Sequence, residues 1–304
     1  MTLPRAQDVK TIAVLGFGVM GHTWTTALLA GGLDVVVYEA NAQNVESNTN
    51  RVRKYLERMV QKGVLEEDVE RAMQRLQFVE SEEALAKCGA QALLEVIFED
   101  LDLKCATFER ISAWLSPETL VWSNTSCLDV EKMAMASGRP DRFVGTHGMN
   151  PVHLTKGVEI VRHPQLAEQA LDCTLGVMQR IDKAPFVTDN VPGFIVNNGL
   201  IPWMIHYYLM LERGQATTLD IDTALRTSLG HPQGVFMLHD YVGTNTMVLV
   251  SEALYEATLD PRYKLPRFIH DMRDAGHMGF SSGRGFYDWR DPKNPEPIAF
   301  AELS

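Results

Sequence analysis

Residues 11–39 read TIAVLGFGVMGHTWTTALLAGGLDVVVYE, and this stretch decides the fold. A short apolar run at residues 11–15 is followed at once by a glycine-rich turn at residues 16–21 and then by an apolar stretch to residue 30. After two further glycines, a second apolar and β-branched run occupies residues 34–38. The order predicts strand, glycine turn, helix and strand, which together make one βαβ unit.

Each glycine of the turn has a physical role in binding a dinucleotide. Gly16 permits a tight turn, Gly18 lets the backbone approach a pyrophosphate, and Gly21 lets the helix pack closely on the strand. Val19 and Met20 lie at the start of the helix, where the N-terminus faces an anion. A glycine motif alone also fits an incidental turn or another nucleotide fold, so its surroundings carry the prediction.

An acidic residue after the second strand supports a dinucleotide and selects the cofactor. Glu39 follows the second strand directly, where a carboxylate can hold ribose hydroxyls. Its charge would repel a 2′-phosphate, and no Arg or Lys lies between Glu39 and Arg51. The sequence therefore predicts NAD rather than NADP, the alternative being a solvated carboxylate without a ligand.

The pattern beyond residue 39 alternates between helical and strand periods. A helical hairpin with a break at Lys62-Gly63 is predicted for residues 44–73. Further strands are predicted at residues 76–79, 93–97, 120–122, 143–146, 158–161 and 185–188, with helices at 81–87, 101–114 and 129–136. This alternation predicts an α/β fold, a Rossmann-like doubly wound and largely parallel sheet with the hairpin as an insertion.

The chain becomes almost wholly helical after a Pro-Gly pair near residue 190. Helices are predicted at residues 194–213, 219–229, 235–258 and 262–275. We therefore expect two domains: an NAD-binding domain at residues 1–190 and an all-α domain for substrate binding and dimerisation at residues 191–304.

Composition excludes several classes of protein. With 45% apolar and 22% charged residues, the chain is expected to be soluble and globular, and its net charge of −11 argues against a nucleic-acid binder. No apolar run reaches membrane-spanning length and no signal peptide is recognisable, so we expect a cytoplasmic protein without a membrane partner. Four widely spaced cysteines without a CxxC pair predict reduced packing residues and no metal site.

Later motifs resemble a known family. They are EVIFEDLDLK at residues 95–104, SNTS at 123–126, GTHGMNP at 145–151, PGFIVN at 192–197 and SGRGFY at 282–287. Their order and spacing resemble the 3-hydroxyacyl-CoA dehydrogenases, including short bacterial 3-hydroxybutyryl-CoA dehydrogenases, over essentially the whole chain. The resemblance implies an NAD-dependent oxidoreductase of fatty-acid metabolism that oxidises an L-3-hydroxyacyl-CoA.

The resemblance implies that His147 is the general base, that Glu159 is its partner, and that Ser126 and Asn197 hold the reacting oxygen of the substrate. Alcohol oxidation independently needs a base with a pKa near neutrality, a role that suits histidine. Taken singly, these residues also fit a structural histidine, an edge carboxylate and turn or helix caps.

The resemblance also implies cofactor contacts from Glu99 and Lys104, although a charge on a helix surface explains Lys104 equally well. It further implies that basic residues of the hairpin bind the CoA phosphates. We assign Arg58 and Lys62 to this role, within a basic cluster that otherwise contains Arg51, Arg53 and Lys54. Val64 replaces a lysine that is common in bacterial relatives.

Two departures from the family pattern leave the substrate open. Gly148 and Met149 replace the usual two phenylalanines, which predicts a larger or looser space near the reacting carbon, refilled in part by Met149. Asn198 and Gly199 stand where an Arg and an apolar residue are common. A free hydroxy acid, as in relatives acting on gulonate or carnitine, is therefore an alternative substrate.

Two more distant alternatives are an S-adenosylmethionine-dependent methyltransferase and a non-catalytic NAD-binding protein. The first has no use for the His147 and Glu159 pair, and the second has no need to keep the four site residues. The apolar content of the helices after residue 194 exceeds what one buried face requires, and the family forms dimers through this domain. We therefore expect a homodimer with the substrate held in the cleft between the domains.

Overall fold

The computed structural model describes residues 3–303 and divides the chain into two compact units, of which the first ends at Phe194 and the second begins at Ile195. The first unit is built around one eight-stranded sheet with the strand order β3-β2-β1-β4-β5-β6-β7-β8. Its strands are β1 (Thr11–Leu15), β2 (Asp34–Tyr38), β3 (Leu76–Phe78), β4 (Ala92–Glu95), β5 (Leu120–Ser123), β6 (Phe143–Gly148), β7 (Gly157–Arg162) and β8 (Ala184–Asp189).

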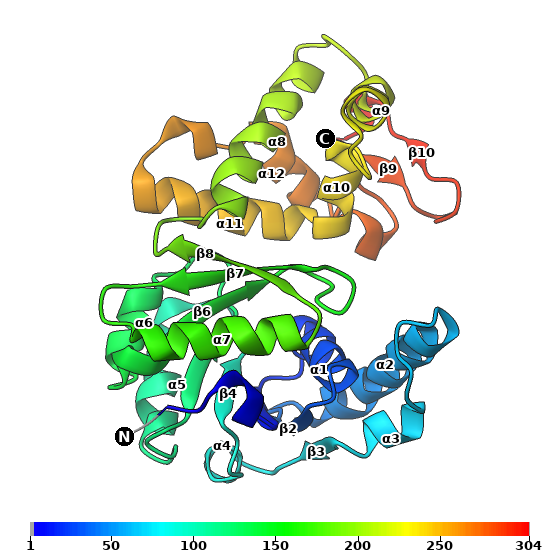
Figure 1. Ribbon diagram of the computed structural model, residues 1–304. Helices are drawn as coiled ribbons and strands as arrows, with labels where there is room; N and C mark the ends of the chain where they lie inside the picture. Colours follow the sequence, from blue (N-terminus) through cyan, green and yellow to red (C-terminus); the bar gives the residue numbers. More distant parts are fainter. Residues whose placement is uncertain (1–2, 304) are drawn as a thin grey trace. The chain divides into compact units, whose positions relative to one another are not determined.

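Among the described strands of this sheet, β6 and β7 pair antiparallel and the other neighbours run parallel. The predicted Rossmann-like, largely parallel sheet is therefore confirmed. The helices that accompany the sheet are α1 (Val19–Ala30), α2 (Ala42–Gln61), α3 (Val69–Met73), α4 (Glu82–Ala86), α5 (Leu101–Ser112), α6 (Val130–Ala136) and α7 (Glu168–Arg180) (Figure 1). The hairpin insertion is α2 and α3, and α7 is a helix that the sequence pattern did not reveal.

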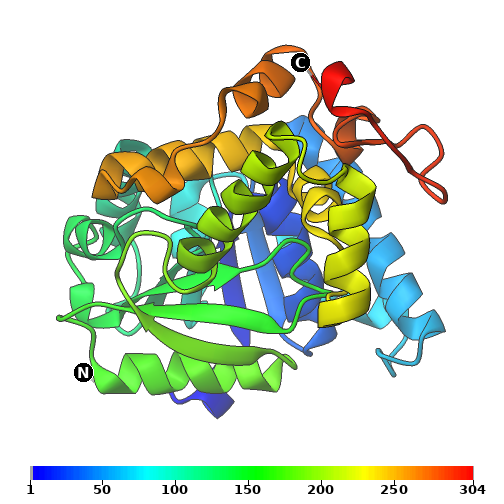
Figure 2. The ribbon, with the colours of Figure 1, turned by 90° about the horizontal axis from the view of Figure 1, so that it is seen from above.

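Side chains alternate between the two faces of the sheet, and each face has its own apolar core. Ile12 and Val14 of β1 belong to the core that also contains buried residues of α1, α2 and α7. Ala13 and Leu15 belong to the opposite core, beneath α4, α5 and α6. Figure 2 shows α7 running beside β7 and β8, against which it packs. The carboxyl ends of β1, β4 and β5 and the glycine turn therefore lie at one edge, where ligands of such sheets bind.

The second unit is helical, with one additional pair of very short strands. Its elements are α8 (Val196–Glu212), α9 (Thr218–Leu229), α10 (Val235–Val242), α11 (Thr244–Thr258), α12 (Arg267–Asp274), β9 (Tyr287–Asp288) and β10 (Glu296–Pro297). The single helix predicted for residues 235–258 is wrong, because Gly243 at φ +93° separates α10 from α11.

Buried carboxylates fasten the C-terminal tail to these helices. Asp240 accepts hydrogen bonds from the backbone N–H groups of Phe286 and Tyr287 and from the indole of Trp289. Asp222 accepts a hydrogen bond from the Tyr287 hydroxyl at 2.8 Å. The tail that carries the SGRGFY motif thus completes the core of the second unit.

Candidate functional site

The glycine turn after β1 has the geometry that a pyrophosphate needs. Gly16 adopts φ +101°, and a Cβ on Gly21 would lie 2.3 Å from the Gly16 carbonyl oxygen, so only glycine allows this close approach. Gly18 caps α1, and a Cβ built there would meet no atom beyond its chain neighbours within 4 Å among the described residues. The backbone at Gly18 thus borders open space at a helix N-terminus, as binding of a phosphate requires. Val19 and Met20 form the first turn of α1.

Glu39 lies beside this turn. Its Oε2 accepts a hydrogen bond of 2.5 Å from the backbone N–H of Phe17, and its Oε1 accepts one of 2.9 Å from the N–H of Asn41. The carboxylate is thus fixed at the end of β2, next to the glycine turn. These residues fit the adenosine half of NAD, with Gly18 open to a phosphate and Glu39 placed to receive ribose hydroxyls.

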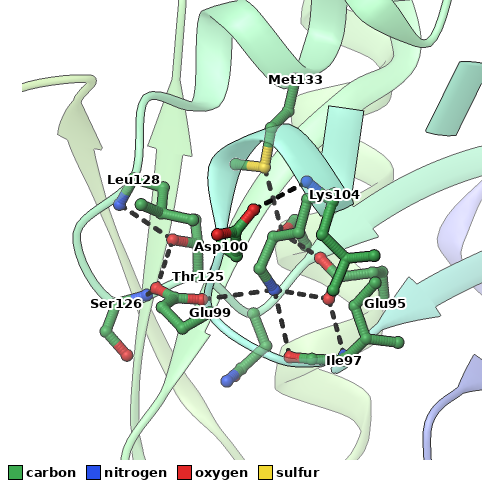
Figure 3. Close-up of polar contacts among 12 residues, drawn as sticks. Glu95, Ile97, Glu99, Asp100, Lys104, Thr125, Ser126, Leu128 and Met133 are labelled. Carbon is green, nitrogen blue, oxygen red and sulfur yellow. Dashed lines mark hydrogen bonds and ion pairs between the residues drawn. The ribbon is translucent and has the colours of Figure 1, made fainter. Parts of the chain in front are cut away.

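A buried ion pair occupies the carboxyl end of β4 (Figure 3). Lys104 Nζ lies 2.5 Å from Glu95 Oε1, and the side chains are 1% and 0% exposed, respectively. Burial alone would lower the pKa of Lys104, but Glu95 and Glu99 outweigh burial and raise it, so the ammonium group stays charged. The surface-charge explanation of Lys104 is wrong, because the side chain lies inside the protein.

The network continues from Lys104 to the SNTS motif. Glu99 Oε2 lies 3.3 Å from Lys104 Nζ, while Glu99 Oε1 accepts hydrogen bonds from the Thr125 hydroxyl at 2.7 Å and from the Ser126 N–H at 2.6 Å (Figure 3). Ser123 donates to Glu95 Oε2 at 2.6 Å. Lys104 therefore holds together the loops that follow β4 and β5. Sequence reasoning missed Glu95, although its position at the end of an apolar strand was a signal.

His147 and Glu159 come from the one antiparallel strand pair of the sheet. They are direct cross-strand partners on β6 and β7, and His147 Nδ1 lies 2.7 Å from Glu159 Oε2. Both are buried, with exposures of 5% and 0%. Because a carboxylate only accepts hydrogen bonds, it favours the tautomer with the proton on Nδ1, which leaves the lone pair of the neutral ring on Nε2.

Ser126 and Asn197 lie in different units. Ser126 belongs to the loop after β5 and is joined to Glu99 through its backbone, as described above. Asn197 is the second residue of α8 and belongs to the second unit. Their contact with the reacting oxygen stays a prediction.

Arg58 and Lys62 line a pocket of about 720 Å³ within the first unit. Lys156 and Lys183, which sequence reasoning missed, line the same pocket from the segments next to β7 and β8. Burial and the nearby Lys156 lower the pKa of Lys183 to about 8. Within residues 3–303 the only acidic side chain that lines this pocket is Asp182, so the pocket favours an anion.

Trp24 of α1 packs against Gly148. A Cβ on Gly148 would lie 2.7 Å from Cζ2 of Trp24, because the indole of this α1 residue occupies the place of a side chain. Trp24 thus replaces the aromatic bulk missing at Gly148, on the face of β6 opposite to His147. The looser space near the reacting carbon, refilled in part by Met149, stays a prediction. Within residues 3–303 there is also no group of three or more His, Cys, Asp or Glu side chains that could hold a metal ion.

A dinucleotide turn and a buried His–Glu pair on one doubly wound sheet define the class of NAD-dependent oxidoreductases. Sequence models of a family described as "3-hydroxyacyl-CoA dehydrogenase, NAD binding domain" and "3-hydroxyacyl-CoA dehydrogenase, C-terminal domain" match residues 11–191 and 193–289. The chain belongs to the 3-hydroxyacyl-CoA dehydrogenase family.

Individual relatives extend over nearly the whole chain. A 3-hydroxybutyryl-CoA dehydrogenase of Bradyrhizobium diazoefficiens is 30% identical, over 95% of this chain and 98% of the relative. The crystal structure of Mycobacterium tuberculosis FadB2 superposes with a TM-score of 0.87 at 32% identity, covering 92% of this chain and 99% of that one. The (S)-3-hydroxybutyryl-CoA dehydrogenase PaaH1 of Ralstonia eutropha gives a TM-score of 0.84 at 30% identity, covering 91% and 98%.

Proposed function

We propose that the protein oxidises a short-chain L-3-hydroxyacyl-CoA to the 3-ketoacyl-CoA, with His147 as the general base. The observation that carries the proposal is the 2.7 Å contact between His147 Nδ1 and Glu159 Oε2, which directs the basic Nε2 away from the carboxylate. The relatives that act on 3-hydroxybutyryl-CoA support a short acyl chain.

In this mechanism the residues of the chain move one proton. NAD, when bound, supplies the acceptor for the hydride that leaves C3 of the substrate. His147 Nε2 takes the proton of the C3 hydroxyl as the C–O bond becomes a carbonyl, and Glu159 stabilises the imidazolium that results. Ser126 and Asn197 donate hydrogen bonds to the reacting oxygen and orient it toward His147. In the reverse direction the imidazolium returns the proton.

Cofactor binding falls to the first domain, residues 1–190. Gly16, Gly18 and Gly21, with Val19 and Met20, take the pyrophosphate, and Glu39 takes the adenosine ribose. Glu99 and Lys104 support the nicotinamide end from the carboxyl edge of β4. The open space at Gly18 and the fixed carboxylate of Glu39 support this assignment.

The basic pocket in the first unit receives the phosphates of CoA. Arg58 and Lys62 provide charge from α2, while Lys156 on the opposite wall is paired with Asp182. A free hydroxy acid carries no phosphate and has no need of such a pocket.

To the second domain, predicted at residues 191–304, we assign part of the substrate site and a homodimer contact; the second compact unit begins at Ile195. Leu219, Leu229 and Leu249 are each more than half exposed on its helices, and a second copy of the chain would cover such apolar side chains. A mass that stays monomeric in light scattering at every concentration would contradict the dimer. We further propose the cytoplasm as the compartment, since its reducing conditions keep the four free cysteines as thiols.

The substrate is tested by NADH oxidation with acetoacetyl-CoA and with a panel of free 3-keto acids. We expect turnover with acetoacetyl-CoA and little with free acids. The variant Arg58→Ala/Lys62→Ala should raise the KM for acetoacetyl-CoA about 10-fold, more at low salt, without changing kcat. Arg51→Ala/Lys54→Ala is the matched control, because these residues lie on the same helix but do not line the pocket. Preference for a free acid, or equal KM changes in both variants, would contradict the proposal.

A further inference from the structure

Trp24 lies behind the strand that carries the base. It is a fully buried residue of α1, and its indole edge packs against Gly148, the residue that follows His147. A Cβ on Gly148 would lie 2.7 Å from Cζ2 and 3.0 Å from Cε2 of Trp24. These distances are shorter than ordinary van der Waals contacts, so the indole of Trp24 leaves no room for a side chain at position 148.

The indole also makes a specific hydrogen bond. Its Nε1–H donates to Asn124 Oδ1 at 2.7 Å, and the backbone N–H of Gly148 donates to the same oxygen at 3.0 Å. Both partners can only donate, so the orientation of the Asn124 amide is settled: its oxygen faces them. Asn124 itself is anchored, because its backbone N–H donates to the carbonyl of Glu95 at 3.0 Å.

The hydrogen bonds connect three parts of the proposed site. Asn124 precedes Ser126 by two residues, Gly148 follows His147, and Trp24 lies on the helix that Gly18 caps. Since side chains alternate along a strand, the indole supports β6 from the face opposite to His147. A shift of the indole would thus move the base relative to the glycine turn.

We propose that Trp24 is a positioning residue of the reaction: through the Asn124 amide it fixes the end of β6, and so sets where His147 stands relative to the bound cofactor and substrate. This proposal rests on the proposed function, in which His147 is the base. An aromatic ring without a donor would not fix the Asn124 amide, because a phenylalanine at position 24 would lack the N–H group that donates to it. A misplacement of about 1 Å costs up to about 100-fold in rate, so the effect is measurable.

The test is Trp24→Phe, which removes the donor but keeps an aromatic ring. We expect kcat for acetoacetyl-CoA reduction to fall about 10-fold or more, while the Kd of NADH and the KM of the substrate change less than 3-fold. Trp122→Phe is the matched control, because Trp122 is buried in the same core and donates its indole N–H to Thr174 at 3.0 Å. It should lose thermal stability to a similar degree and keep its kcat.

A second variant keeps the proposal testable if Trp24→Phe does not fold. Gly148→Ala retains the indole and forces it to move, so kcat should fall with little change in NADH affinity. Adding Trp24→Phe to Gly148→Ala should restore part of kcat, because the smaller ring makes room for the new methyl group. A wild-type kcat in folded Trp24→Phe or Gly148→Ala, or an equal loss of kcat in Trp122→Phe, would overturn the positioning role. If His147→Gln keeps its activity, the proposed function fails instead.

Discussion

His147 and Glu159 are twelve residues apart in sequence and face each other across β6 and β7, with 2.7 Å between Nδ1 and Oε2. The pairing exists because β7 turns back antiparallel to β6, whereas the other neighbouring strands of this sheet run parallel. A register shift of one residue would move both side chains to the other face of the sheet. The strand pairing itself therefore orients the imidazole, without help from a flexible loop.

Removal of the imidazole should abolish turnover without affecting cofactor binding. In His147→Gln we expect kcat to fall by about 10³-fold, within the usual contribution of general acid–base catalysis, because no group at this position can take the hydroxyl proton. The Kd of NADH, measured by its fluorescence, should stay within 2-fold of wild type. Turnover close to wild type would contradict the assignment of the base.

Glu159 should affect kcat only through its contact with His147. We expect Glu159→Gln to lower kcat by about 10- to 100-fold, since an amide neither stabilises the imidazolium nor selects its tautomer as well. The double variant His147→Gln/Glu159→Gln should be no slower than His147→Gln alone, because the two residues act as one unit. Additive losses in a double-mutant cycle would show that Glu159 acts independently.

Loss of the Glu39 charge should relax the choice of cofactor. In Glu39→Ala we expect the ratio of kcat/KM with NADPH to that with NADH to rise about 10-fold or more, because the repulsion of a 2′-phosphate disappears. Glu46→Gln is the matched control: it removes the same charge from an exposed position on α2. Unchanged discrimination in Glu39→Ala, or an equal change in Glu46→Gln, would refute the repulsion argument.

The parts of the fold that could be predicted from the sequence depend on local chemistry. A strand, a glycine turn and a helix within residues 11–30 are specified by neighbours in the chain. Both ends of β1 and the C-terminal end of α1 were predicted correctly, while α1 begins at Val19, inside the predicted glycine turn. The hairpin break after α2 likewise coincides with Lys62 and Gly63. Glu159 lies within the predicted strand 158–161, whereas His147 lies one residue beyond the predicted strand 143–146, because β6 continues to Gly148.

The features that escaped prediction depend on residues distant in sequence. Trp24 fills the space beside Gly148 across 124 positions of sequence, and no periodicity reveals such a contact. Lys104 has the sequence context of a surface residue, and only the packing of α5 on β4 buries it against Glu95. Lys156 and Lys183 reach the pocket of Arg58 because the segments before β7 and β8 approach α2 in space.

Removing one partner of the buried Glu95–Lys104 pair should lower the unfolding free energy more than replacing both partners by uncharged residues. Lys104→Met leaves the Glu95 carboxylate buried without its cation, so we expect the unfolding free energy of the first unit to fall by about 3–5 kcal/mol. The double variant Glu95→Gln/Lys104→Met should recover part of the loss, because the fully buried carboxylate is gone and Glu99, the other partner of Lys104, is 35% exposed. Denaturant unfolding checks both, and an unchanged midpoint in Lys104→Met would contradict the prediction.

His239 should make the stability of the second unit depend on pH. Its ring is fully buried between the Tyr208 hydroxyl, 2.7 Å from Nδ1, and Thr244 Oγ1, 3.0 Å from Nε2. Because the Thr244 hydroxyl donates to the carbonyl of His277, it accepts from His239, and the imidazole is neutral with its proton on Nε2. Burial lowers the pKa of His239 to about 3.

In the unfolded chain His239 has the ordinary histidine pKa near 6.5, so as the pH falls the unfolded state is protonated before the folded state. Acid therefore favours unfolding, and stability is lost as the pH falls below about 6.5. Between pH 7.5 and 5 the wild type should lose about 2 kcal/mol relative to His239→Gln, which cannot titrate. Asp240, whose pKa burial raises to about 6, titrates in the same range with the opposite sign, but it is present in both proteins and cancels in the comparison. Denaturant unfolding at several pH values measures the difference. Parallel pH dependences for wild type and His239→Gln would contradict this prediction, because they would mean that folding does not lower the pKa of His239.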